Sequence, residues 1–217
     1  MAAPMAAQAD ATIYGKLHTS IDVGDTGGDD IAGGDKASST YWQSNSSRIG
    51  FKGSEDLGGG LKAIWQIESN VAVGSRTGSN QDDKDVDFGG RNTYVGLQGG
   101  WGKILMGRHD HPTKIIGRKV DLFYSTQLGE NRALTAVNSG LDLRSDNIVA
   151  YGTPSWGGFQ VLAAYTAHPS LGTTLGATDI YSDGDGFDIA AWWSQGGFLV
   201  GGGYLSVDER SGDFDAY

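Results

Sequence analysis

The sequence predicts an all-β fold, a transmembrane antiparallel up-and-down β-barrel, and three observations support this prediction. Apolar and polar residues alternate in segments of about ten residues, the length that a tilted strand needs to cross a bilayer. Short glycine-rich connections alternate with long ones along the chain. The sequence has no run of about 18 apolar residues and no convincing 3.6-residue period, so we expect no transmembrane helix and little helix overall.

The alternation is clear in the first half of the chain. In "LKAIWQIESN", residues 61–70, one set of side chains is apolar and the other is mostly polar. Successive side chains of a strand point to opposite faces, so this segment has one apolar face and one polar face. Similar patterns occur at 12–23 and 44–53. The prediction for 61–70 places Leu61, Ala63, Trp65 and Ile67 outside the barrel, and Lys62, Gln66 and Glu68 inside it.

The second half continues the pattern at residues 91–98, 159–166, 187–194 and 198–207. A further strand begins at "DFDAY", the last five residues. The chain therefore supplies about nine to ten strands of a barrel.

The connections between these segments are sorted by length. Short ones occupy 55–60, 99–102, 154–158 and 195–197, and long ones occupy 24–40, 72–88, 112–143, 168–184 and 208–213. A membrane barrel has short turns at one rim and longer loops at the other, which produces this alternation. A soluble sandwich with Greek-key connections has no reason to sort its loops in this way.

Composition excludes several other classes. The chain has 217 residues, 36 Gly, 4 Pro and no Cys, and its formal net charge is -10. Without cysteine there is no disulfide framework and no thiolate metal site. The 16 Lys and Arg residues are scattered, which argues against nucleic acid as a partner. We expect no cofactor and no bound metal.

The first nine residues resemble the end of an export signal. They finish in Ala7-Gln8-Ala9, a small-x-small pattern of the kind that signal peptidase cuts. We therefore expect 1–9 to be a residual signal peptide and the mature chain to begin at Asp10.

Several segments resemble the general diffusion porins of Gram-negative outer membranes. They are "ATIYGKL", "SSRIGFKGSEDLGGGLKAIWQIE", "RNTYVGLQGGWGKILMGRHDHP" and "NIVAYGTPSWGGFQVLAAY". The resemblance implies a porin-type barrel in the outer membrane, assembled as a homotrimer among lipid. Such barrels have about 16–18 strands, so it also implies that 10–217 is the N-terminal part of a single porin domain.

The same resemblance implies a function and a site. The function is a water-filled channel for passive diffusion of small hydrophilic solutes and ions, without enzymatic activity. The longest connection, 112–143, is expected to fold inward and narrow the channel. Its acids Asp121 and Glu130 would face a wall cluster of Arg48, Arg91 and Arg144, with Glu68 beside it. The channel lining would include Lys16, Lys52 and Lys62.

The predicted constriction charges balance, so we expect only a weak cation preference, set by the potential at the channel mouth. The alternative function is a β-rich extracellular carbohydrate-binding or adhesin domain. We interpret His109 and His111 as surface residues, because two neighbouring histidines without a third ligand rarely hold a metal. No Ser-His-Asp set and no carboxylate pair stands out in the sequence, so we predict no catalytic residues.

Overall fold

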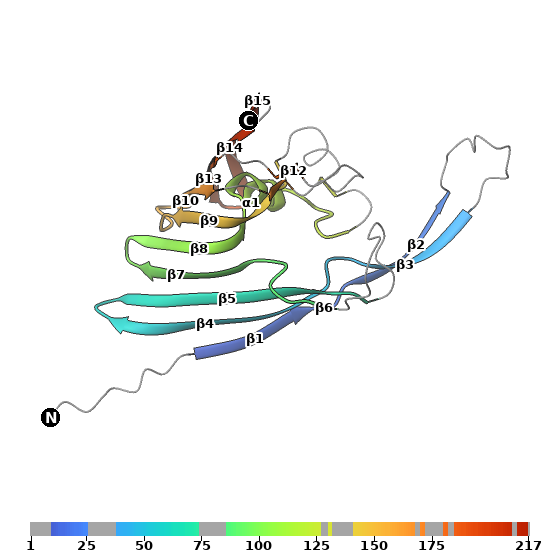
Figure 1. The fold of residues 1–217 in the computed structure, drawn as a ribbon, viewed down its shortest axis with the longest axis horizontal. Coiled ribbons are helices and arrows are strands. Elements are labelled where there is room, and N and C mark those ends of the chain that lie inside the picture. Colours follow the sequence, from blue (N-terminus) through green and yellow to red (C-terminus); the bar gives the residue numbers. More distant parts are fainter. Residues whose placement is uncertain are drawn as a thin grey trace.

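The computed structural model describes residues 10–25, 38–73, 86–126, 130–131, 141–167, 170–171, 180–181, 185–209 and 212–216. Its main feature is one curved antiparallel sheet in which each strand pairs with the next strand of the main path (Figure 1). The ten strands of this path are Asp10–Lys16 (β1), Arg48–Gly58 (β4), Leu61–Val71 (β5), Thr93–Gly99 (β7), Gly102–Asp110 (β8), Arg144–Gly152 (β9), Phe159–Ala167 (β10), Asp185–Gln195 (β13), Phe198–Glu209 (β14) and Gly212–Ala216 (β15). The predicted all-β, up-and-down fold of about nine to ten strands is confirmed.

Shorter elements lie at one end of this sheet. Thr19–Asp25 (β2) and Ser38–Ser44 (β3) form a separate hairpin, and Ser170–Leu171 (β11) pairs with Ile180–Tyr181 (β12). The two-residue strand Val86–Asp87 (β6) pairs with β5. The expected single strand at 12–23 is thus divided at Leu17 and His18, where β1 ends and the hairpin begins.

The opposite end of the sheet carries tight glycine turns, as the sequence predicts. Between β4 and β5, Gly58, Gly59 and Gly60 have φ values of 86°, 62° and 81°. Residues with a Cβ rarely adopt these left-handed values, which explains the glycine run at this turn. The strand ends from which the long connections leave lie at the other rim.

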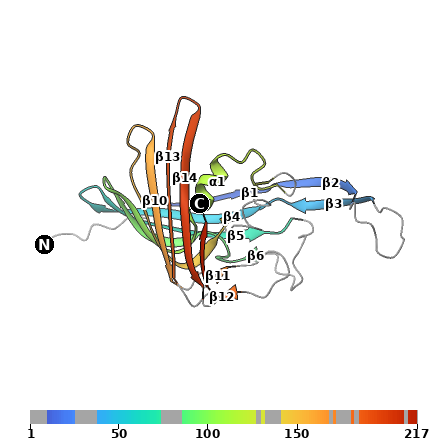
Figure 2. The same cartoon turned by 90° about the horizontal axis from the view of Figure 1, so that it is seen from above.

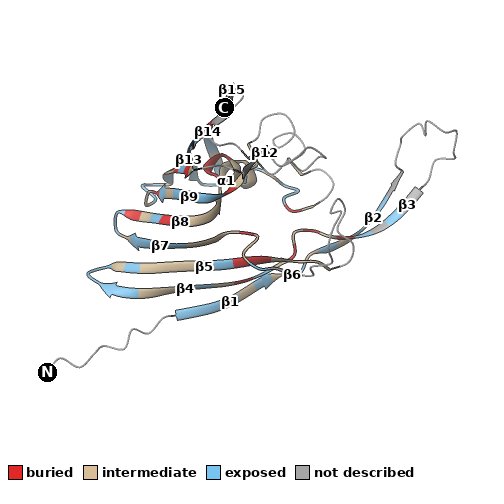
Figure 3. Cartoon of the chain, viewed as in Figure 1, coloured by how far each residue is buried: buried red, intermediate tan, exposed pale blue. Residues whose placement is uncertain are grey.

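The two faces of the sheet differ in chemistry. One face is apolar and exposed: Val95 is 57% exposed, Met106 55% and Val200 66%. The strand register places Glu68, Lys52 and Lys62 together on the other face. The register therefore confirms the predicted separation of Leu61, Ala63, Trp65 and Ile67 from Lys62, Gln66 and Glu68. Figure 3 shows that the burial is uneven, with buried segments near β13 and at the far end of β5.

One helix interrupts the β-structure at Pro112–Lys119 (α1). It contacts β10, β13 and β14 and lies on the side toward which the sheet curves (Figure 2). From the sequence we expected a long connection without a helix here, because no helical period is evident. A helix of 8 residues is too short to show a clear period or to be stable in isolation, so its packing must stabilise it. Within the described ranges, no helix is long and apolar enough to cross a membrane.

Candidate channel lining and constriction

The first charged group on the polar face surrounds Glu68. Arg91 Nε donates to Glu68 Oε1 at 2.5 Å, and Arg48 Nε lies 3.7 Å from Oε2. Tyr14 adds a hydrogen bond from its hydroxyl to Oε2 at 2.9 Å. Glu68 and Arg91 are buried, at 7% and 8% exposed. A carboxylate with two cations and a phenol donor is well compensated for that burial.

Arg91 reaches this group from an unexpected position. The strand β7 begins at Thr93, so Arg91 belongs to the segment before the strand and not to the alternation within it. Its backbone N–H donates to the carbonyl of Glu68 at 3.1 Å, which fixes it beside β5. The structure thus brings Arg48, Arg91 and Glu68 together, as the sequence analysis expected.

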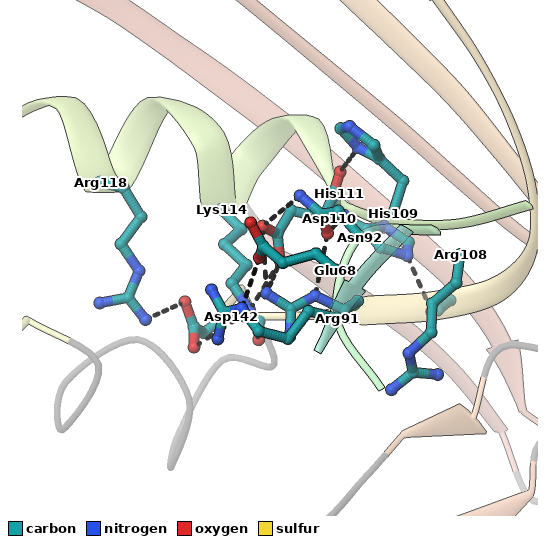
Figure 4. A network of polar contacts seen from close by, with 12 residues as sticks. Glu68, Arg91, Asn92, Arg108, His109, Asp110, His111, Lys114, Arg118 and Asp142 are labelled. Atoms are coloured by element: carbon teal, nitrogen blue, oxygen red, sulfur yellow. Dashed lines mark hydrogen bonds and ion pairs between the residues drawn. The ribbon is translucent and has the colours of Figure 1, made fainter. Parts of the chain in front are cut away.

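Arg144 belongs to a second group. Its Nη2 lies 3.0 Å from Asp110 Oδ1, and its Nε donates to Asn92 Oδ1 at 3.0 Å. Asn92 in turn donates from Nδ2 to Asp110 Oδ2 at 3.1 Å. The arginine at the start of β9 is therefore held by the end of β8 and by the segment before β7. Figure 4 shows its two partners, Asp110 and Asn92, close together.

The helix α1 extends this second group into a row of alternating charges. Lys114 Nζ lies 3.0 Å from Asp110 Oδ1 and 3.6 Å from Asp142 Oδ2. Arg118 Nη2 lies 2.5 Å from Asp142 Oδ1. Arg118 also pairs with Asp121 and Glu130. The row runs from Arg144 through Asp110, Lys114, Asp142 and Arg118 to the two loop acids.

The surroundings shift the pKa values of Lys114 and Arg118, two of the helix cations, in opposite directions. Burial lowers the pKa of Lys114, and the neighbouring carboxylates of Asp110 and Asp142 offset only part of this effect. Burial also acts to lower the pKa of Arg118, but Asp142 and Glu130 outweigh it and the pKa is raised. Lys114 is therefore the helix charge that alkaline pH removes first.

The two predicted loop acids, Asp121 and Glu130, form ion pairs with a cation that was not predicted as their partner. Among the described residues, the ion pairs of Asp121 and Glu130 are with Arg118 and not with Arg48, Arg91 or Arg144. Sequence reasoning missed Arg118, together with Asp110, Lys114 and Asp142. A usable signal was present, because Asp110, Lys114 and Arg118 are spaced by four residues, the spacing that aligns side chains along a helix.

The predicted lining lysines share the face of the Glu68 group. Lys16 stands opposite Arg48 in the register, and Lys52 stands opposite Gln66. Lys62 stands opposite Asp56 near the glycine turn. Lys52 Nζ lies 5.1 Å from the centre of the Tyr14 ring. These lysines therefore share one face of β1, β4 and β5 with the acids Asp56 and Glu68.

A third polar group is fully buried beneath α1. His111 Nδ1 lies 3.2 Å from Asp188 Oδ2, and His111 Nε2 lies 2.9 Å from Ser145 Oγ. All three residues are 0% exposed. The interpretation of His111 as a surface residue is therefore wrong, because β13, which follows much later in the chain, carries a buried carboxylate that pairs with the ring. His109 instead lies 5.3 Å from the Tyr94 ring, between ring centres.

No group of three or more His, Cys, Asp or Glu residues able to hold a metal ion occurs in the described part of the chain. The buried Ser145, His111 and Asp188 have the connectivity of a catalytic triad, which the sequence did not reveal because the three residues are far apart along it. Full burial of the serine hydroxyl leaves no space for a substrate, so this set has a structural explanation.

Comparisons with known proteins agree with this architecture. A family model described as Gram-negative porin matches residues 1–217. Major outer membrane protein P.IB of Neisseria gonorrhoeae is 30% identical over 98% of this chain and 56% of the relative. P.IB of Neisseria meningitidis serogroup A is 32% identical over 94% of this chain and 56% of the relative. The chain thus spans about half the length of these relatives.

A solved structure has the same fold. The anion-selective porin from Comamonas acidovorans matches with a TM-score of 0.60 at 22% identity, over 96% of this chain and 71% of that one. At this identity the likeness concerns the fold alone. An outer membrane protein of Vibrio cholerae, in a form that lacks one loop, matches with a TM-score of 0.54 at 19% identity.

Proposed function

Because the chain belongs to the family of Gram-negative porins and is an outer-membrane protein, we propose that the full-length protein forms a water-filled channel. The channel would allow passive diffusion of small hydrophilic solutes and ions, and the proposal includes no enzymatic activity. Residues 10–217 would form part of one porin barrel, 1–9 would be the remainder of a signal peptide, and the complete protein would be a homotrimer.

The single observation that supports this proposal most strongly is the distribution of apolar and charged side chains. Val95, Met106 and Val200 are more than half exposed on one face, whereas Glu68 and Arg91 are buried on or beside the other. A soluble sheet buries its apolar face, so this arrangement suits a sheet whose apolar face contacts lipid. The charged face would then border water.

The constriction proposal extends to the helix. α1 lies on the charged side of the sheet, and it carries Lys114 in its first turn and Arg118 in its last turn. We propose that these two residues, with Asp121 and Glu130, form one side of the constriction. Arg48, Arg91 and Glu68 would form the other, and Arg144, which shares Asp110 with Lys114, would lie where the two sides meet. Lys16, Lys52 and Lys62 would line the approach.

The geometry supports a transverse field across such a constriction. The Glu68 group carries two cations and one carboxylate, whereas Arg118 is shared among three carboxylates. The wall would therefore be positive and the loop negative. Polar solutes and water align with such a field more readily than apolar solutes, which selects by polarity as well as by size.

The test is reconstitution of the full-length protein into planar bilayers. We expect stepwise, ohmic increases in current, and a small reversal potential toward cations in a salt gradient. Heat-modifiable migration on a gel would report the folded barrel in the same sample. A folded barrel that gives no current, or strong anion selectivity from the wild type, would contradict the proposal as stated.

A further inference from the structure

The buried group beneath α1 holds the beginning of the 112–143 connection to two separate strands. Asp188 on β13 accepts hydrogen bonds from the Thr113 hydroxyl at 2.7 Å, from the Thr113 backbone N–H at 3.2 Å and from His111 Nδ1 at 3.2 Å. His111 Nε2 lies 2.9 Å from Ser145 Oγ on β9. Asp188 and Ser145 are both 0% exposed.

Asp188 supplies the N-terminal cap that the residues of α1 themselves do not provide. The N-cap residue His111 makes no side-chain capping hydrogen bond, and the first turn contains no acidic residue. The first backbone N–H groups of a helix need an acceptor, and a negative charge near them is favourable. Asp188, 75 residues further along the chain from Thr113, provides that acceptor and that charge.

The adjoining strand provides a space for the same turn of the helix. A Cβ placed on Gly203 of β14 would lie 2.8 Å from Thr113 Cγ2, closer than side chains allow. On the neighbouring Gly202, a Cβ would have no atom within 4 Å. The absence of a side chain at 203 therefore lets α1 approach β14, whereas the glycine at 202 has no such role.

We propose that Asp188 is a positioning residue of the channel: by capping α1 from β13, it holds the helix against the wall and thereby sets the position of Lys114 and Arg118. Gly203 contributes the space into which Thr113 fits. His111 Nδ1 lies within hydrogen-bond distance of the Asp188 carboxylate, and the Ser145 hydroxyl lies within hydrogen-bond distance of Nε2, so the ring links β13 to β9. This proposal rests on the proposed channel function, because positioning matters only if the helix borders the pore.

The first test is independent of conduction. The full-length wild type, Asp188→Ala and Gly203→Ala are folded in detergent, and trypsin cleavage within α1, after Lys114 or Arg118, is followed over time. Asp188→Ala removes a buried acceptor that serves several donors, and Gly203→Ala places a methyl group 2.8 Å from Thr113. Each change favours local opening of α1, so we expect cleavage to be about tenfold faster in both variants. Asp146→Ala and Gly202→Ala are the controls, since Asp146 pairs with Arg108 and not with the helix.

The second test measures single-channel current in the same variants. Asp188→Ala and Gly203→Ala should show open-channel noise several-fold above wild type, while the two controls should not. Asp188→Asn, which keeps an acceptor but loses the charge, should be intermediate.

The outcomes separate the two proposals. A wild type that is folded but does not conduct contradicts the channel function, and the cleavage rates then still test the capping role. Cleavage in Asp188→Ala at the wild-type rate overturns the capping role. Faster cleavage with unchanged current noise overturns the role in the channel. A thermal midpoint for each variant, measured by heat-modifiable migration, distinguishes local release of α1 from unfolding of the whole sheet.

Discussion

The polar face of the sheet is used in two different ways at its two ends. Along β4 and β5 it carries charges, and Lys52 and Lys62 are exposed on it. Along β13 and β14 the same face carries mostly small or apolar residues, among them Ala190 and Leu205, which are 1% and 0% exposed, and α1 packs against both strands. The same alternating strand pattern therefore provides a charged wall on β4 and β5 and a docking surface for α1 on β13 and β14.

The difference is a matter of side-chain size and charge. Gly201 and Gly203 on β14 leave room for Ile116 and Thr113 of the helix. The paired strand β13 places the carboxylate of Asp188 beside this surface, and the N-terminus of α1 donates a hydrogen bond to it. On β4 and β5 the corresponding positions are the long cations Lys52 and Lys62, and Glu68. The following predictions test this comparison, from the largest expected effect to the smallest.

The largest effect, a loss of stability, is expected at the charged wall on β4 and β5, from Glu68→Ala. This change leaves Arg48 and Arg91 close together without their shared carboxylate. Breaking a buried ion pair costs about 3–5 kcal/mol, so the urea midpoint of the folded protein should fall markedly. Glu55→Ala at the exposed end of β4 is the control and should change little. Equal midpoints for the two variants would show that the Glu68 group does not stabilise the wall.

The next effect tests which face meets lipid. Val95→Arg places a charge on the apolar face of β7, and Gln98→Arg places one on the polar face of the same strand. A charge on the lipid side costs about 2–4 kcal/mol near mid-membrane, so Val95→Arg should lower the yield of heat-modifiable barrel in lipid vesicles. Gln98→Arg should fold as the wild type does. The reverse order would mean that the two faces are assigned the wrong way round.

A smaller effect is expected from the helix side of the constriction. Arg118→Gln removes the cation shared by Asp121, Glu130 and Asp142. Those carboxylates would become available to permeating cations, so the cation-to-anion permeability ratio should rise about two- to fivefold. Reversal potentials in a salt gradient measure it. Arg108→Gln, remote from the helix and paired with Asp146, is the matched control.

The smallest effect concerns alkaline pH. The pKa of Lys114 is lowered because the residue is buried, so it loses its proton at a pH below the ordinary range for lysine. Loss of this positive charge should increase cation preference as the pH rises, before the exposed lysines titrate. Reversal potentials measured from pH 7 to 10 should show this step in wild type and not in Lys114→Met. A step of the same size in the variant would assign it to other lysines.

Much of this fold could be predicted from the sequence, because alternation and loop length are local properties. The pattern at 61–70 predicts both faces of β5, and the glycine run after Asp56 predicts the turn. The helix α1 and the buried acceptor Asp188 could not be predicted in the same way. Both depend on a contact between segments 75 residues apart, for which the sequence shows no local pattern.

The site was predicted in part for the same reason. The ion pairs of Glu68 with Arg48 and Arg91 agree with the predicted grouping. Arg91, however, lies in the segment before β7 and not within the strand. The pairing of Asp121 and Glu130 with Arg118 was missed, because the loop was expected to contain no helix that could present a cation. The opposition of these acids to Arg48, Arg91 and Arg144 across the channel stays a prediction.

Thiol accessibility at two adjacent positions of β4 tests the central claim most directly. The chain contains no cysteine, so Lys52→Cys and Phe51→Cys each introduce a single thiol, on the polar and the apolar face respectively. In bilayers containing the full-length protein, a membrane-impermeant charged thiol reagent should modify the cysteine at 52 and reduce the current, and should leave the variant at 51 unchanged. Modification at 51 with protection at 52 would contradict the assignment of the charged face to the channel and the apolar face to lipid.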